Sequence, residues 1–164
     1  MISFQEVNES DIPQLRDLAK KSWQAAYAKI LSEEQIAYML LEMYSEEVIS
    51  EQIKSPNYFY FFIKEENIDQ GFIGYEIHYE EETTKLHRIY LLEKAKGKGV
   101  GKEALKFLRQ QVSEAHDQRI ILNVNKNNPA QHFYKSLGFT VYEEGIFDIG
   151  NGFVMDDYLM EIRL

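Results

Sequence analysis

One stretch of the chain, residues 86–124, constrains the fold more than any other. An apolar run, Leu86 to Leu92, has the composition of a buried strand, and a second buried strand is predicted from Arg119 to Val124. The spacing of apolar residues between them predicts a helix from Gly101 to Ala115. A strand–helix–strand unit is almost always right-handed with parallel strands. The sequence therefore predicts one parallel pair of strands in an otherwise antiparallel sheet.

The turn between this first strand and the helix reads Lys-Gly-Lys-Gly-Val-Gly-Lys, from Lys96 to Lys102. Glycines at such a turn let the backbone come close to a ligand, and the first N–H groups of a helix have no internal partner. Residues 94–102 also contain four lysines and no acidic residue. We therefore expect this loop to bind an anion, most simply a pyrophosphate, rather than only to relax a tight turn.

Two well-known phosphate loops do not fit this stretch. The dinucleotide pattern G-x-G-x-x-G requires a third glycine where this chain has Lys102. The P-loop pattern G-x-x-x-x-G-K-[ST] requires a glycine at Lys96 and a hydroxyl residue at Glu103. The loop is therefore expected to bind neither NAD nor ATP in the usual way.

The rest of the chain reads as alternating helices and strands without a linker or repeat. The expected elements are a strand at Phe4–Val7, helices beginning near Asp11, Ser32 and Ser45, strands at Tyr58–Ile63 and Phe72–Tyr79 bounded by turns at Glu65–Gly71 and Glu80–Thr84, a short helix at Pro129–Leu137, and a strand, turn and strand from Phe139 to Leu164. At 164 residues the chain is expected to form a single domain, 1–164, of α/β (α+β-like) class.

Composition excludes several classes of function. The absence of cysteine rules out disulfides, thiolate zinc sites and a Cys nucleophile. The histidines show no metal-ligand spacing, so no metal is expected (His78, His87, His116 and His132). A net charge of −9 argues against nucleic-acid binding. Without a signal-like N-terminus or a long apolar run, the protein is expected to be cytoplasmic with no membrane partner. The oligomeric state is left open, a homodimer included.

Two motifs in this order resemble the GNAT superfamily of N-acetyltransferases. Lys96 to Gly101 match the family's acetyl-CoA loop, (Q/R)-x-x-G-x-(G/A), except that Lys96 replaces Gln or Arg. Asn127, Ala130 and Tyr134 match its N-x-x-A-x-x-x-Y motif, which Leu-Gly-Phe completes at residues 137–139. The resemblance implies the GNAT fold, a single mixed and mostly antiparallel sheet of about seven strands with helices on both faces and the parallel pair at the cofactor site.

The chain also resembles the PaiA-type polyamine acetyltransferases over nearly its whole length. The likeness lies in the helices from Trp23 to Tyr44, in Arg88-Ile89-Tyr90 and in the tail from Val154 to Met160. It implies that the acceptor is a small-molecule amine such as spermidine or spermine, which attacks acetyl-CoA directly in a ternary complex.

The GNAT resemblance also implies roles for individual residues. Tyr134 would be catalytic, giving a proton or a hydrogen bond to the departing CoA sulfur. The backbone of three strand residues would bind the pantetheine arm, the loop N–H groups would hold the pyrophosphate, and an asparagine would contact the CoA arm. These cofactor-binding residues are Ile89, Tyr90, Leu91, Lys96, Gly97, Lys98, Gly99, Val100, Gly101, Lys102 and Asn127, together with Tyr134.

The proton acceptor is less well defined, because a primary amine is charged at pH 7 and must lose a proton before it attacks. Some relatives use a glutamate where this chain has Asn123. By position the candidates are Glu76, His87 and Asp148. Acidic residues that could lie near a cationic acceptor are Glu80, Glu81, Glu82, Asp148, Asp156 and Asp157.

Two other functions fit the same motifs. A peptide or protein N-terminal acetyltransferase would differ in its substrate class. A CoA-binding regulatory domain would keep the loop without turnover, and Tyr134 argues against it, because a binding module needs no donor near the sulfur.

Overall fold

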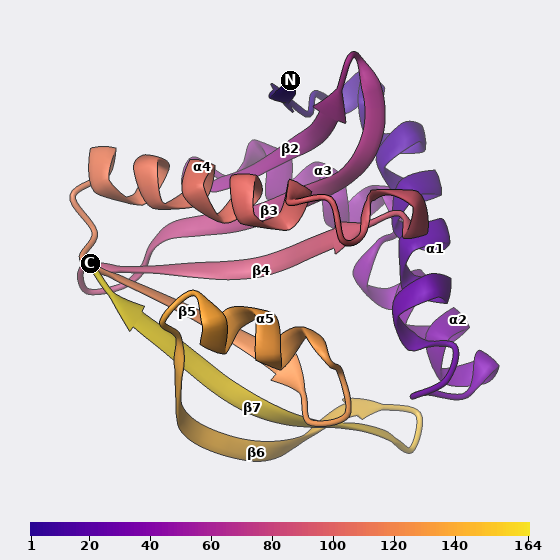
Figure 1. The fold of residues 1–164 in the computed structure, drawn as a ribbon. Helices are drawn as coiled ribbons and strands as arrows, with labels where there is room; N and C mark the ends of the chain where they lie inside the picture. Colours follow the sequence, from indigo (N-terminus) through magenta and orange to yellow (C-terminus); the bar gives the residue numbers. More distant parts are fainter.

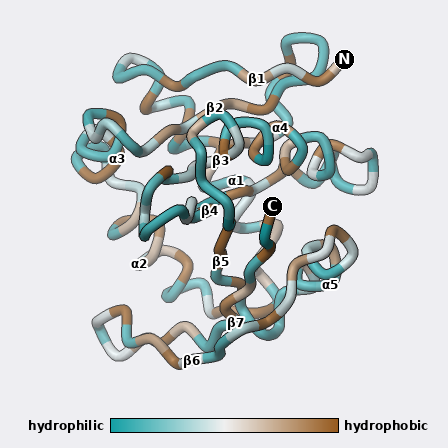
Figure 2. Tube along the Cα trace, turned by 90° about the vertical axis from the view of Figure 1, so that its left-hand side faces the viewer, coloured by the Kyte–Doolittle hydropathy of each residue, from teal (hydrophilic) through white to brown (hydrophobic).

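The structure, a computed structural model, describes residues 1–164 and is built on a seven-stranded sheet in the order β1-β2-β3-β4-β5-β7-β6. Figure 2 shows the sheet running from β1 at one end of the molecule to β6 at the other. The strands are β1 (Ile2–Glu6), β2 (Tyr58–Glu65), β3 (Ile68–Glu80), β4 (Thr83–Leu91), β5 (Arg119–Asn125), β6 (Thr140–Gly150) and β7 (Phe153–Arg163). Only β4 and β5 pair in parallel, as the sequence predicted.

Helices cover both faces of this sheet (Figure 1). The α-helices are α1 (Ile12–Tyr27), α2 (Glu33–Met43), α3 (Glu46–Lys54), α4 (Val100–Glu114) and α5 (Ala130–Ser136), and short 3-10 turns lie at Glu9–Asp11 and Glu93–Ala95. One apolar core lies between α1, α2, α3 and the sheet, around Trp23 and Phe62. A second lies under α4 and α5, around Leu108 and Ile120. None of the helices combines the length and the apolar character that a membrane span requires.

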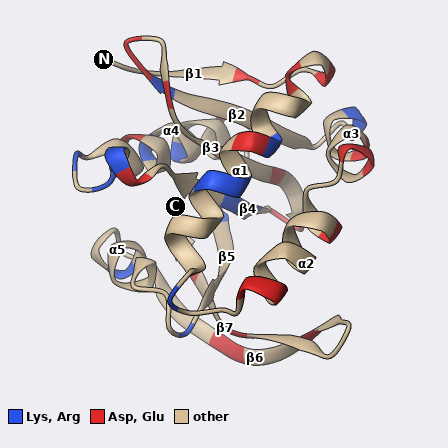
Figure 3. Ribbon diagram, turned by 90° about the vertical axis from the view of Figure 1, so that its right-hand side faces the viewer, with Lys and Arg blue, Asp and Glu red and all other residues tan.

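Local sequence signals explain where two of the helices begin. The Ser32 hydroxyl accepts a hydrogen bond from the Gln35 N–H at 3.1 Å, and the Ser45 hydroxyl accepts one from the Val48 N–H at 3.2 Å. Acidic residues fill the first turns of both helices, where they oppose the positive end of the helix dipole (Figure 3). Both starting points agree with the sequence prediction.

The strand boundaries differ from those predicted. The first strand begins earlier, at Ile2, and the polar turn expected over residues 65–71 is only the pair Glu66 and Asn67. Both turn residues have positive φ, 50° and 65°, as a tight two-residue hairpin requires. The strands β2 and β3 therefore extend through most of the predicted turn.

A bulge in β4 separates the parallel pair partway along its length. Gly74 of β3 pairs with Arg88 and Tyr75 pairs with Leu86, so His87 is an extra residue in β4. The parallel pairing of β4 with β5 ends at Leu86 and Leu122, although both strands continue. Because a bulge bends and twists its strand, we attribute the divergence of β4 from β5 to His87.

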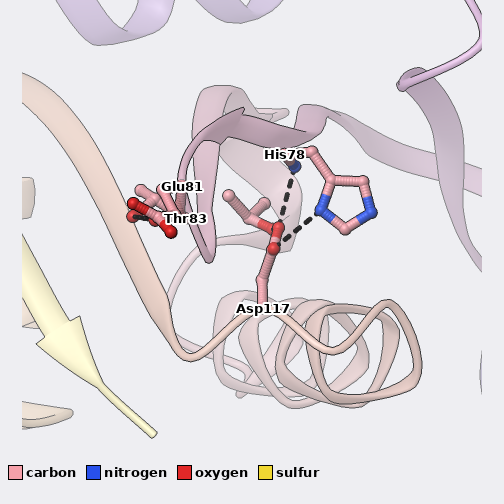
Figure 4. Close-up of polar contacts among 5 residues, drawn as sticks. His78, Glu81, Thr83 and Asp117 are labelled. Carbon is pink, nitrogen blue, oxygen red and sulfur yellow. Dashed lines mark hydrogen bonds and ion pairs between the residues drawn. The ribbon is translucent and has the colours of Figure 1, made fainter.

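A buried carboxylate links the turn between α4 and β5 to the β3–β4 hairpin, at the end of the parallel pair opposite to the bulge (Figure 4). Asp117, in the turn after α4, accepts hydrogen bonds from the His78 N–H at 2.8 Å and from the Thr84 hydroxyl at 2.7 Å. Its other oxygen lies 2.8 Å from the His78 ring. Burial opposes ionisation, but these hydrogen bonds outweigh it and lower the pKa of Asp117. The cluster fixes the start of β5 beside the β3–β4 hairpin.

Candidate active site

A cavity of about 1390 Å³ lies where β4 and β5 diverge. Its walls come from the ends of these two strands, the loop before α4, α5 with the loop that precedes it, and the C-terminal end of α1. Since pairing stops at Leu86 and Leu122, the facing edges of β4 and β5 have no strand between them. Backbone N–H and C=O groups at such edges need partners, so an extended ligand can bind there as an added strand would.

The glycine loop forms one end of this cavity. Gly97 and Gly99 have φ of 76° and 79°, and a Cβ at either position would meet no atom within 4 Å. None of the backbone N–H groups from Gly97 to Lys102 donates a hydrogen bond, and the first helical bond of α4 runs from the Glu103 N–H to the Gly99 carbonyl. Free N–H groups, the N-terminus of α4 and open space together fit a pyrophosphate.

Nearly all the residues predicted to bind the cofactor line this cavity. They are Ile89, Tyr90, Leu91, Lys96, Gly97, Gly99, Val100, Gly101, Lys102, Asn127 and Tyr134. Lys98 does not line it and is exposed. The Lys96 ammonium lies 3.3 Å from the Glu93 carboxylate. The structure thus brings together all the nominated residues except Lys98.

Asn127 is free of the helix-capping role that its position suggests. The side chain of its neighbour, Asn128, accepts a hydrogen bond from the Ala130 N–H at 2.9 Å and so caps α5. The Asn127 backbone N–H bonds to the Asn125 side chain at 2.9 Å, whereas the Asn127 amide group makes no hydrogen bond within the protein. Its side chain is therefore available to a ligand in the cavity.

Tyr134 lies on α5, buried between the aromatic rings of Phe133 and Phe139. Its hydroxyl makes no hydrogen bond within the protein and is not fully buried, and the residue lines the cavity. Burial, and then the nearby Tyr27, raises the pKa of Tyr134 above its ordinary value. The phenol is therefore protonated at neutral pH and can donate a hydrogen bond into the cavity.

Tyr27 of α1 also lines the cavity. Its hydroxyl lies 3.0 Å from the Tyr90 hydroxyl, and its ring packs at 4.7 Å from the Trp23 ring. Burial is the main cause that raises its pKa, and the Asp157 carboxylate raises it further.

The candidate bases fall in different places. His87 lines the cavity, stacks on Tyr58 at 5.0 Å and bonds to the Glu76 carboxylate at 3.0 Å, so these two candidates form one pair. Burial lowers the pKa of His87 to about 4, despite the Glu76 hydrogen bond, so the ring is neutral at pH 7. Asp148 lies exposed near the β6–β7 turn, accepts a hydrogen bond from the Gly150 N–H, and does not line the cavity.

Other acidic residues expected near the acceptor are engaged elsewhere. Asp156 lies 3.0 Å from the Lys126 ammonium, and Glu80 lies 3.6 Å from the Arg119 guanidinium. No group of three or more potential metal ligands is present. Asp157 is buried, its Oδ1 atom has no hydrogen-bond partner, and it does not line the cavity.

Comparisons with known proteins place the chain in a family. The model of the "Acetyltransferase (GNAT) domain" matches residues 27–159. The spermidine N(1)-acetyltransferase of Thermoplasma acidophilum is 26% identical over 161 residues, covering 94% of this chain and 96% of the relative. An uncharacterized N-acetyltransferase of Lactobacillus delbrueckii subsp. lactis is 24% identical over 157 residues, covering 92% and 91%.

A solved structure supports the same family assignment. The crystal structure of the PaiA N-acetyltransferase of T. acidophilum in complex with coenzyme A superposes with a TM-score of 0.84 at 25% identity, covering 100% of this chain and 99% of that one. The predicted fold, family and co-substrate are thereby confirmed. The chain belongs to the GNAT superfamily and is an N-acetyltransferase that uses acetyl-CoA.

Proposed function

We propose that the protein transfers the acetyl group of acetyl-CoA to a primary amine of a small polyamine such as spermidine or spermine. The amine attacks the thioester directly while both substrates are bound. The observation that carries the choice of acceptor is the similarity, over 94% of the chain, to a relative described as a spermidine N(1)-acetyltransferase. The acidic composition, 27 Asp and Glu against 18 Lys and Arg, also suits a polycation.

In this proposal the cofactor lies along the divergence of β4 and β5. The backbone of Ile89, Tyr90 and Leu91 binds the pantetheine arm, and the free N–H groups from Gly97 to Lys102 bind the pyrophosphate. Asn127 contacts the arm through its free amide. Lys98 stands outside the cavity, so its contribution is limited to its backbone N–H and long-range attraction.

Tyr134 stabilises the leaving group. Its hydroxyl is protonated and has no other partner, so it can donate a hydrogen bond to the CoA sulfur as negative charge develops. Because its pKa is raised, full proton transfer to a thiolate whose conjugate acid has a pKa of about 8.5 is unfavourable. Hydrogen-bond donation is therefore the role that the environment favours.

The first prediction concerns the glycine loop. Gly99→Val should weaken CoA binding at least tenfold, about 1.4 kcal/mol, because the side chain would occupy the open space in front of the free N–H groups. Gly152→Val is a matched control, since Gly152 has the same φ of 79° and the same open surroundings but lies in the β6–β7 turn. Both variants carry similar backbone strain. Calorimetric titration with CoA measures the difference, and equal affinities would mean that the loop is only a turn.

The second prediction concerns Tyr134. Tyr134→Phe should lower the chemical rate by about tenfold to a thousandfold, about 1.4 to 4 kcal/mol, because it removes one donor and keeps the ring packing. Acetyl-CoA affinity should stay nearly unchanged. Tyr142→Phe, on the edge strand β6, is the control that should leave the rate unaltered. Single-turnover kinetics measure the rate of the chemical step. An unchanged rate in Tyr134→Phe would show that Tyr134 has no part in the mechanism.

The third prediction concerns the acceptor. Spermidine, a simple monoamine and a peptide with a free N-terminus are each incubated with acetyl-CoA, and released thiol is measured. Spermidine should be preferred, and its KM should rise with ionic strength while that of the monoamine stays nearly constant, because salt screens the attraction of a polycation to the acidic protein. A preference for the peptide would instead favour an N-terminal acetyltransferase.

A further inference from the structure

The cavity wall contains very few side chains that can accept a proton at neutral pH. Among the lining residues Glu93 is the single acid and His87 is the single histidine. Glu93 lies beside the glycine loop, with its carboxylate 3.3 Å from the Lys96 ammonium. The other titratable lining residues are lysines, an arginine and tyrosines, which are residue types that are protonated at pH 7. His87 is therefore the one candidate base that the cavity holds away from the pyrophosphate end.

His87 is the extra residue of the β4 bulge, and the bulge turns its side chain toward the core under α1, α2 and α3. Neighbouring side chains of a regular strand point to opposite faces, yet His87 and Arg88 face the same core. The His87 ring stacks on Tyr58 with ring centroids 5.0 Å apart, and the Arg88 guanidinium donates a hydrogen bond to the Tyr60 hydroxyl at 2.6 Å. Both tyrosines belong to that core. Bulges that aim a side chain in this way are common next to active sites.

The direction of the cofactor brings its reactive end to this bulge. In the proposed function the pyrophosphate lies at residues 97–102, and the pantetheine arm pairs with Leu91, Tyr90 and Ile89 in turn. A strand advances about 3.3 Å per residue, so an extended arm that continues back along β4 next reaches Arg88 and His87. Both residues line the same cavity. The thioester is therefore expected beside the bulge.

The Glu76 carboxylate of β3 holds the His87 ring in one tautomer. Its oxygen lies 3.0 Å from the Nε2 atom, and because a carboxylate only accepts hydrogen bonds, Nε2 carries the ring proton. The lone pair is then on Nδ1, which makes no hydrogen bond within the protein and is not fully buried. The His87 side chain is 22% exposed, and the residue lines the cavity. A free acceptor atom is thus open to a ligand.

The surroundings of the ring keep it neutral. They are a carboxylate, two cations and two phenols, from Glu76, Lys85, Arg88, Tyr58 and Tyr79. Burial is the main cause that lowers the pKa of His87, to about 4, and the hydrogen bond to the carboxylate acts in the opposite direction. The two cations lower it as well. The lone pair therefore stays available at pH 7.

We propose that His87 is the catalytic base, whose Nδ1 accepts a hydrogen bond from the acceptor amine and takes the proton that the amine loses on attack. Glu76 is the positioning residue, because it fixes the tautomer and faces the positive charge that forms on the ring. A carboxylate orients a catalytic histidine in the same way in hydrolytic triads. The inference rests on the proposed function, from which it takes the place of the cofactor and an amine as the acceptor.

The atoms and protons of the step balance. The acceptor reacts as a neutral amine, so an ammonium first gives one proton to solvent. The amine nitrogen forms a bond to the acetyl carbon, the bond from that carbon to the CoA sulfur breaks, and one proton passes from the nitrogen to Nδ1 of His87. The thiolate, hydrogen-bonded to Tyr134, takes one proton from solvent. His87 returns its proton to solvent and is neutral again.

The fourth prediction compares two histidines. His87→Phe keeps a flat ring that can stack on Tyr58 but removes the lone pair, so kcat/KM for the amine should fall about a hundredfold to ten-thousandfold at pH 7. His132→Phe makes the same change at an exposed position of α5 that does not line the cavity, and it should alter kcat/KM little. Both variants should keep the CoA affinity of the wild type. Wild-type kcat/KM in His87→Phe would overturn the inference.

Two further variants distinguish a base from a packing residue. His87→Ala should be inactive alone and should regain activity as imidazole is added at pH 8, because free imidazole can take the place of the missing ring. A rate that does not respond to imidazole would mean that the ring only packs. Glu76→Gln removes the charge that faces the ring, and it should lower kcat at least tenfold without changing the KM for acetyl-CoA. An unchanged kcat would contradict the positioning role.

A panel of amines separates this inference from the proposed function. Spermidine and other amines are each incubated with acetyl-CoA and either the wild type or His87→Phe, and released thiol is measured. A loss of turnover in His87→Phe for the best amine supports the inference, whether or not that amine is spermidine. Equal turnover by both proteins overturns the inference and leaves the proposed function standing. If the wild type acetylates no amine, both are wrong.

Discussion

The cavity exists because β4 diverges from β5 partway along the parallel pair. The extra residue His87 bends β4, and the parallel pairing ends at Leu86 and Leu122 while both strands continue. Two strand edges then face each other without a partner, in the middle of a sheet whose faces are covered by helices. In the proposed function the pantetheine arm of acetyl-CoA pairs with these edges, and the glycine loop and Tyr134 line the same cavity.

Much of this arrangement follows from local patterns in the sequence. The strand, glycine loop, helix and strand from residue 86 to residue 125 are specified by hydrophobic spacing and by glycine, and serine caps mark the starts of α2 and α3. Two features escape such patterns. The turn at Glu66 and Asn67 uses positive φ without glycine, and the bulge at His87 depends on register with β3 rather than on the residue itself.

The surroundings of the acidic residues were the least predictable part, because they are set by elements far apart in the chain. Adjacent acids, Asp156 and Asp157, look equivalent in the sequence, but alternate residues of a strand point to opposite faces. Asp156 lies 3.0 Å from the Lys126 ammonium, whereas Asp157 is buried and does not line the cavity. Only the place of β7 between β5 and β6 in the sheet distinguishes the two.

Backbone hydrogen exchange with and without CoA tests the central claim most directly. Binding should slow exchange at the amides of residues 97–102, which donate no hydrogen bond in the protein alone, and in the stretch of β4 beyond the bulge, residues 88–91. The edge strand β6 should exchange at the same rate in both states. Protection that spares both segments, while CoA is bound, would contradict the assignment of the cofactor to the divergence of β4 and β5.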